Sequence, residues 1–164
     1  MPTKRIAIVP GSFDPITYGH IDIVERAAAE YDKVFLAVTI NPSKEYLFSI
    51  TERTAIAEAA LRPYQNVEVI ASEGMLWKLA KELGACALVK GYRNEVDYEY
   101  EMKMAEFNLE HNPDAPTVLY RANETLEHVS STVVRDRIQK GLSLDAYLPK
   151  DAVEEMKKIL NSRA

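Results

Sequence analysis

Five short apolar runs alternate along the chain with segments whose apolar residues recur at helical spacing. The runs are RIAIV (5–9), KVFLAVT (33–39), VEVIA (67–71), ACALVK (85–90) and TVLYR (117–121). Their continuous apolar character is typical of parallel strands that are covered on both faces, and the helical segments supply the crossovers that parallel strands need. The sequence therefore predicts a Rossmann-like α/β fold with a doubly wound, five-stranded parallel sheet.

Local signals mark the helices between these runs. Apolar residues recur at i, i+3, i+4 and i+7 from Val24 and again from Leu76, which gives each helix one buried face. Ser49 and Glu52 match a capping box that opens the second helix, and Gly84 stands where glycine ends the helix that begins near Leu76. The C-terminal half predicts three further helices, near 97–111, 131–140 and 150–161.

Composition limits the domain organisation and the classes of function. A chain of 164 residues with 47% hydrophobic content can form one sizeable core and contains no linker-like tract, so we expect one domain over residues 1–164. No apolar run approaches the roughly 20 residues of a membrane-spanning helix, so we expect a soluble, cytoplasmic protein without a membrane partner. The net charge of −5 argues against a nucleic-acid partner. The one cysteine, Cys86, lies in an apolar run and is expected to be a buried hydrophobe.

The stretch PGSFDPITYGH (10–20) follows the first predicted strand and leads into the first predicted helix. Ligands of open α/β sheets bind beyond the carboxyl ends of the strands, which is where this loop must lie. Gly11 allows close approach of the backbone, Ser12 offers a hydroxyl, and a helix that opens at Gly19-His20 exposes N–H groups that attract phosphate. We therefore expect this loop to bind an anion.

The loop does not use either of the two most frequent phosphate-binding motifs. Both the dinucleotide pattern GxGxxG and the P-loop pattern GxxxxGK[ST] are absent from it. Residues 17–20, TYGH, instead resemble the [TH]-x-G-H signature of the nucleotidyltransferase superfamily. A GH dipeptide alone would leave His20 as an ordinary residue of a helix N-terminus, but the strand-loop-helix setting favours the functional interpretation.

Five blocks extend this resemblance over nearly the whole chain to one family, the phosphopantetheine adenylyltransferases. They are PGSFDPITYGHIDIVERA (10–27), NPSKEYLFSITER (41–53), KGYRNEVDYEYE (90–101), HVSSTVVRD (128–136) and YLPKDAV (147–153). The resemblance implies an enzyme of coenzyme A synthesis, in which the phosphate of 4'-phosphopantetheine attacks the α-phosphorus of ATP in line. Dephospho-coenzyme A and pyrophosphate are the implied products, with no covalent intermediate.

The resemblance also implies site residues. Those implied in catalysis are His20, which stabilises the transition state, Ser12, Lys44 and Arg93. The implied ATP-binding residues are Ser12, Phe13, His20, Gly91, Tyr92, Arg93, Glu101, Leu126, Glu127, His128, Val129, Ser130, Ser131 and Thr132. The implied substrate-binding residues are Ser12, Lys44, Leu76 and Lys90.

Further expectations concern ligands and assembly. Magnesium is expected to neutralise the triphosphate of ATP, and the spacing of the carboxylates suggests no protein metal ligand. The resemblance further implies a homohexamer and coenzyme A as a feedback ligand.

Several of these residues have a structural alternative. Lys44 and Arg93 could be solvated surface charges, and Glu101 could belong to a solvated acidic helix face. The cluster 130–132 could be the N-cap of the next helix, a role compatible with anion binding.

Three positions depart from the usual pattern of the family. Ser12 stands where threonine is common and keeps the hydroxyl. Lys90 stands where arginine is usual, which replaces a planar fork by a point charge. Leu126 stands where a large aromatic residue is often found.

Two other functions remain open from the sequence. One is a different adenylyltransferase of the superfamily, for example one whose acceptor is nicotinate mononucleotide, although such an enzyme would not be expected to share NPSKE or YLPKDAV. The other is a non-catalytic nucleotide-binding subunit, against which the joint presence of Ser12, His20, Lys44 and Arg93 argues.

Overall fold

The computed structural model describes residues 4–163, so four residues of the expected domain, 1–3 and 164, lie outside the described residues. All five strands form one parallel sheet with the order β3-β2-β1-β4-β5. The strands are β1 (Ile6–Gly11), β2 (Lys33–Thr39), β3 (Val67–Ser72), β4 (Ala87–Tyr92) and β5 (Thr117–Arg121). The order runs outward from β1 in both directions, which confirms the predicted doubly wound sheet.

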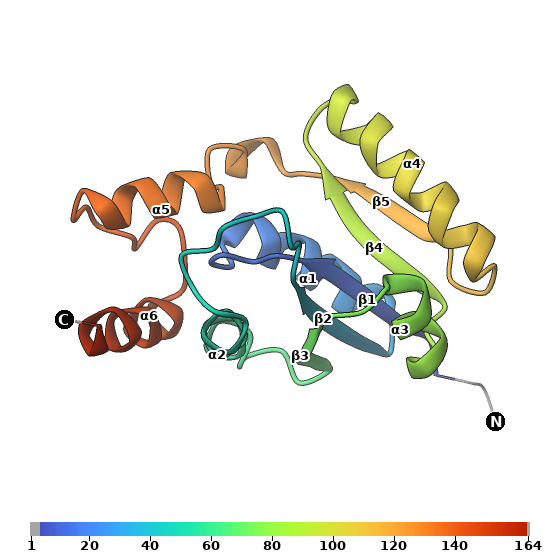
Figure 1. Ribbon diagram of the computed structural model, residues 1–164, viewed down its shortest axis with the longest axis horizontal. Helices are drawn as coiled ribbons and strands as arrows, with labels where there is room; N and C mark the ends of the chain where they lie inside the picture. The colour runs from blue at the N-terminus through green and yellow to red at the C-terminus, as the bar shows by residue number, and fades with distance from the viewer. Residues whose placement is uncertain (1–3, 164) are drawn as a thin grey trace.

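Within the described residues, four α-helices connect successive strands, and a 3-10 turn and two further α-helices follow β5 (Figure 1). They are α1 (Tyr18–Glu30), α2 (Ile50–Ala60), α3 (Leu76–Leu83), α4 (Glu95–His111), η1 (Glu124–Leu126), α5 (Ser131–Gln139) and α6 (Lys150–Ser162). No helix in this part of the chain is long and apolar enough to cross a membrane. The predicted capping box of Ser49 and Glu52 is present, and Gly84 ends α3 with a φ of 66°.

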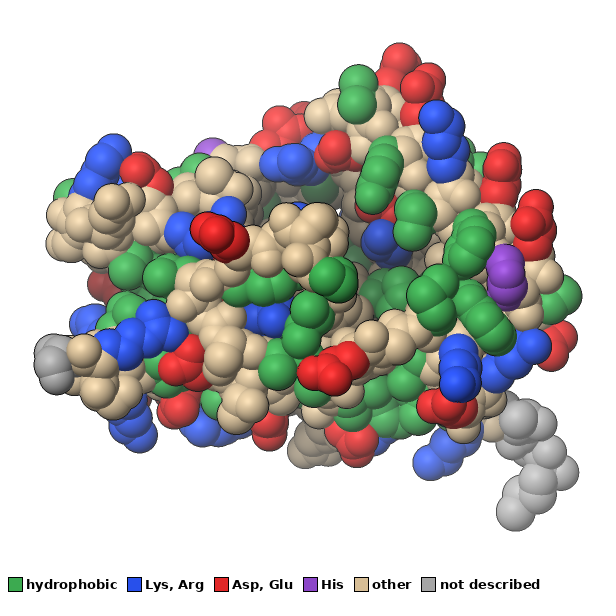
Figure 2. Space-filling model, viewed as in Figure 1, with side chains coloured by type: hydrophobic (Ala, Val, Ile, Leu, Met, Phe, Trp, Pro, Cys, Tyr) green, Lys and Arg blue, Asp and Glu red, His purple; other side chains and the backbone are tan. Residues whose placement is uncertain are grey.

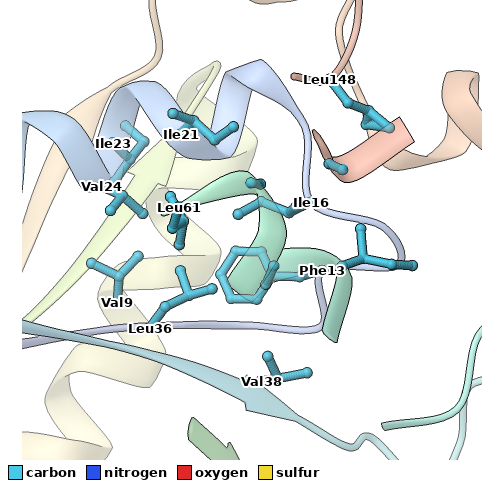
Figure 3. Close-up of a cluster of buried hydrophobic side chains, with 14 of the residues drawn as sticks. Val9, Phe13, Ile16, Ile21, Ile23, Val24, Leu36, Val38, Leu61 and Leu148 are labelled. Atoms are coloured by element: carbon cyan, nitrogen blue, oxygen red, sulfur yellow. The ribbon is translucent and has the colours of Figure 1, made fainter. Parts of the chain in front are cut away.

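Alternation along the strands divides the core between the two faces of the sheet. On β1, Val9 belongs to the larger cluster, which α1, α2 and α6 complete, whereas Ile8 belongs to a smaller cluster beneath α3. Figure 3 shows the larger cluster, where Val9, Leu36 and Val38 from the sheet meet side chains of α1 and of the loop that precedes it. Both faces are therefore covered, as the continuous apolar runs predicted.

Some boundaries differ from those predicted. β1 continues to Gly11, because Pro10 and Gly11 stay in register with Ala37 and Val38 of β2, so the loop is shorter than 10–20. β4 lies two residues later than 85–90, because Ala85 N donates to the end of α3 and strand pairing with β5 continues to Tyr92. α4 begins at Glu95 rather than 97, where the Asn94 side chain accepts a hydrogen bond from the backbone of Asp97. The turn η1 was not predicted.

A buried arginine ties the ends of β1 and β2 to the start of α2. The side chain of Arg53 is only 1% exposed, and its Nε donates to the carbonyl of Phe48 at 3.1 Å. Its Nη1 donates to the carbonyls of Ser12, at 2.7 Å, and Thr39, at 2.8 Å. Ser12 and Phe48 lie outside regular structure and Thr39 is the last residue of β2, so the guanidinium supplies a hydrogen-bond donor to carbonyls where regular backbone pairing ends.

We expect Arg53→Met to destabilise the fold by about 3 kcal/mol, because the methionine fills much of the space but leaves buried carbonyls without a donor. For a domain of this size the loss corresponds to a fall in melting temperature of roughly 10 °C. The matched control is Arg62→Met, which removes an exposed arginine whose ion pair with Asp151 spans 3.4 Å at the surface. Equal melting temperatures for the two variants would contradict the assigned role of Arg53.

Candidate active site

The candidate site lies where the carboxyl ends of β1 and β4 meet. These two strands are neighbours in the sheet, but the chain leaves β1 toward β2 and leaves β4 toward β5, so a crevice opens between the diverging connections. A cleft of about 790 Å³ occupies this position. The space-filling view shows a hollow on this face with Lys and Arg side chains in and around it (Figure 2).

His20 has its tautomer defined by the first turn of α1. The helix begins at Tyr18 with Thr17 as N-cap, and His20 Nδ1 accepts a hydrogen bond from the backbone N–H of Thr17 at 3.0 Å. An Nδ1 that accepts leaves the ring proton on Nε2. The ring stands edge-on to Phe13, with centroids 5.0 Å apart, and His20 lines the cleft. His20 therefore offers an N–H donor to the cleft.

The imidazole of His20 stays neutral at physiological pH. Burial, and to a smaller extent the positive charge of Arg93, lower its pKa to about 4. Because this pKa lies well below 7, the ring carries its single Nε2 proton over the neutral range and does not act as a cation.

Two helix N-termini meet beside His20. Thr17 Oγ1 donates to the carbonyl of Val129 at 3.3 Å, just before α5 begins. A Cβ on Gly19 would lie 3.0 Å from the same carbonyl, which explains the glycine at this position by close backbone approach. Ser130 caps α5 by accepting from Val133 N at 3.2 Å. The positive ends of α1 and α5 thus border one wall of the cleft, an arrangement that favours an anion.

Four cationic side chains line the cleft, and three of them have a partner. Lys90 Nζ lies 2.6 Å from Glu101 Oε2, and Arg93 Nε lies 3.2 Å from Asp97 Oδ2. Arg135 Nη1 donates to the carbonyl of Asp14 at 2.9 Å. The fourth, Lys44, makes no ion pair with any residue in the range 4–163.

The structure brings most of the sequence-predicted site residues to this one cleft. They are Ser12, Phe13, His20, Lys44, Lys90, Gly91, Tyr92, Arg93, Glu101, Leu126, Glu127, Val129, Ser130, Ser131 and Thr132. Two others do not line it. Leu76 packs against the smaller core cluster at the start of α3, and the ring of His128 lies 6.2 Å from that of Tyr147. The ligand contacts of all the residues named here, inside and outside the cleft, remain predictions.

Sequence reasoning missed several residues that shape the cleft. Asp14 is 3% exposed and its carboxylate accepts from the backbone N–H groups of Leu47, at 2.9 Å, and Phe48, at 3.0 Å. Tyr46 and Arg135 line the cleft as well. All of them fall inside the quoted blocks 10–27, 41–53 and 128–136, so the blocks themselves were the available signal.

No group of three or more His, Cys, Asp or Glu side chains within residues 4–163 is placed to hold a metal ion.

Comparison with known proteins adds an independent finding. The family model described as cytidylyltransferase-like matches residues 8–137. A phosphopantetheine adenylyltransferase of Caldanaerobacter subterraneus subsp. tengcongensis is 41% identical over 152 residues, which cover 93% of this chain and 95% of the relative. The enzyme of that name from Alkaliphilus metalliredigens is 38% identical over 154 residues, covering 94% of this chain and 98% of the relative. One from Clostridium perfringens is 37% identical over 158 residues, 96% of each chain. The chain therefore belongs to the cytidylyltransferase-like proteins and, among them, to the phosphopantetheine adenylyltransferase family.

Proposed function

We propose that this protein transfers the adenylyl group of ATP to 4'-phosphopantetheine, forming dephospho-coenzyme A and pyrophosphate. The observation that carries the proposal is similarity over nearly the full chain to several proteins named phosphopantetheine adenylyltransferase. The cleft supports it, because helix N-termini, cations and a neutral N–H donor suit the binding of several phosphate groups.

In the proposed reaction an oxygen of the acceptor phosphate forms a bond to the α-phosphorus of ATP. The bond from that phosphorus to the bridging oxygen breaks on the opposite side, and the electron pair leaves with pyrophosphate. Negative charge on the α-phosphate oxygens grows during this step, so the site must supply donors there rather than a nucleophile or a general base. The Nε2 proton of His20 is such a donor, and its low pKa keeps it in the neutral donor form.

The other proposed roles are positional and electrostatic. Lys44 lies in the β2–α2 connection without an ion pair in the described chain, and we assign its charge to the acceptor phosphate. Arg93, the first residue after β4, is assigned to the ATP phosphates as pyrophosphate departs. Lys90 is assigned to the acceptor phosphate, which must share this cation with Glu101. Ser12 contributes its hydroxyl between the two substrates.

ATP enters, in this proposal, as its magnesium complex, and the metal belongs to the substrate. Two acidic side chains of the cleft are already engaged by cations, Glu101 by Lys90 and Asp97 by Arg93. The buried carboxylate of Asp14 is engaged by backbone N–H groups. The triphosphate oxygens and water are therefore the proposed main ligands of the ion, as magnesium prefers.

The proposal extends to the assembly, the regulation and the location of the protein. A homohexamer is supported by apolar side chains that α4 leaves exposed, namely Val96, Tyr98, Tyr100, Met102, Met104, Phe107 and Leu109. Coenzyme A contains both parts of the proposed product, so we assign it to the same cleft as a feedback ligand. The proposed location is the cytoplasm, where these small molecules are available.

The acceptor decides between the candidate functions. Purified protein with ATP and magnesium is expected to release pyrophosphate when 4'-phosphopantetheine is added, at a kcat/KM at least about 10³ times that with nicotinate mononucleotide, because a site that binds a specific acceptor rejects one lacking its groups. A coupled pyrophosphate assay measures both rates. Faster release with nicotinate mononucleotide would favour the other adenylyltransferase, and ATP binding without release would favour a non-catalytic subunit.

His20 has two separable functions, capping α1 and donating to the substrate. We expect His20→Asn to retain an acceptor near the position of Nδ1 but to lose the Nε2 donor, and to lower kcat by about 10²–10³, the usual cost of one transition-state donor. His20→Ala should lose the cap as well and show the lower melting temperature of the two. His111→Asn, at the far end of α4 and outside the cleft, is the matched control with unchanged kcat. Near-normal turnover of His20→Asn would contradict the donor role.

A further inference from the structure

A tyrosine from the β2–α2 connection touches the serine of the β1–α1 loop inside the cleft. Tyr46 Oη lies 3.2 Å from Ser12 Oγ, although the two residues are 34 positions apart in the chain. Both line the cleft, and Tyr46 follows Lys44 by two residues. The roles assigned above to Ser12 and Lys44 give no function to this contact.

The hydrogen-bond partners of Tyr46 define the direction of the contact. Its Oη accepts from the backbone N–H of Asn41 at 2.8 Å. A phenol has one proton to donate, and among residues 4–163 the acceptor within reach of it is Ser12 Oγ. In the arrangement that gives both the Tyr46 hydroxyl proton and the Asn41 N–H a hydrogen-bond partner, Tyr46 donates to Ser12. The proton of Ser12 is then left free to point into the cleft.

The surroundings of Tyr46 strengthen it as a donor. The guanidinium of Arg53 lies over its ring, 4.0 Å from the centroid. Burial alone would raise the pKa of the phenol, but the hydrogen bond shared with Ser12, the one from Asn41 N–H and the positive charges of Arg53 and Lys44 together outweigh burial and lower the pKa. These two cations, one from α2 and one from the same loop, are the charged groups that act on the phenol. A more acidic phenol is a better hydrogen-bond donor.

We propose that Tyr46 is a positioning residue that holds the hydroxyl of Ser12 with its proton directed at a substrate phosphate. Without the phenol, the Ser12 hydroxyl would be free to rotate and would meet the anion with its proton only part of the time. The proposal rests on the proposed adenylyl transfer, in which Ser12 contacts the substrates. Tyr46 itself donates to Ser12 and does not need to touch the substrate.

Two double-mutant cycles distinguish this role from a purely structural one. Tyr46→Phe keeps the ring over Arg53 and removes only the hydroxyl, and it is combined with Ser12→Ala and, separately, with Lys44→Ala. We expect Tyr46→Phe to lower kcat/KM about three- to tenfold in the wild type and in Lys44→Ala, the cost of one hydrogen bond, but less than twofold in Ser12→Ala. An effect that vanishes in Lys44→Ala and persists in Ser12→Ala would mean that Tyr46 only holds the loop, and would overturn the proposal.

A second readout keeps this inference separate from the acceptor assignment. The same cycles are measured on the dissociation constant of ATP by calorimetry, which needs no acceptor. Failure of the wild type to release pyrophosphate with 4'-phosphopantetheine would refute the proposed function, whereas coupling of Tyr46 to Ser12 in ATP binding would still support the inference. Equal effects of Tyr46→Phe in all three backgrounds, in both readouts, would overturn it. Tyr64→Phe removes a hydroxyl outside the cleft and is the matched control, with neither readout changed.

Discussion

The guanidinium of Arg53 fastens the loop that follows β1 and the loop that precedes α2 to the end of β2. It donates to carbonyls after β1, at the end of β2 and before α2, and it supports the ring of Tyr46 on its face. Asp14 makes the complementary connection, because its carboxylate in the β1–α1 loop accepts from the backbone just before α2. One buried cation and one buried anion thus hold the two loops that carry Ser12 and Lys44 against each other. A site that acts by position needs its loops fixed in this way.

The positive potential in the cleft comes from a few local groups. The chain has a net charge of −5, so the proposed binding of phosphate groups depends on local features rather than on a basic surface. Those features are the N-termini of α1 and α5, the unpaired cation of Lys44 in the described chain, and the Nε2 donor of His20. Glu101 holds Lys90, and Asp97 holds Arg93, so these cations keep defined places before a substrate arrives. Donors set in advance need little rearrangement as charge develops on the substrate.

The sequence was sufficient for features that depend on neighbouring residues. Ser49 and Glu52 lie three positions apart on one helix turn, so their capping box was predictable, and the apolar runs located all five strands within two residues. Family resemblance collected most cleft residues, because its blocks follow the strand ends. It did not reveal which side chains pair across the fold.

The missing information concerns partners that are distant in sequence. From the sequence alone, Arg53 is expected to be one more exposed charge on an amphipathic helix. Its hydrogen-bond partners Thr39 and Ser12 lie 14 and 41 positions away, and no local pattern indicates them. Similarly, the pairing of Tyr46 with Ser12 requires two loops from different strands to meet, and no local pattern records that meeting. The role of His20 in capping was also hidden, because the helix begins at Tyr18, one residue before the expected opening at Gly19-His20, and places His20 at its third position.

The central claim is that ATP lies between the N-termini of α1 and α5 with its α-phosphate at His20. A crystal structure of the protein with ATP and magnesium tests this claim most directly. We expect an α-phosphate oxygen within about 3 Å of His20 Nε2, while Nδ1 still accepts from the Thr17 backbone. A nucleotide bound outside the cleft, or an imidazole that turns its Nδ1 to the phosphate, would contradict it.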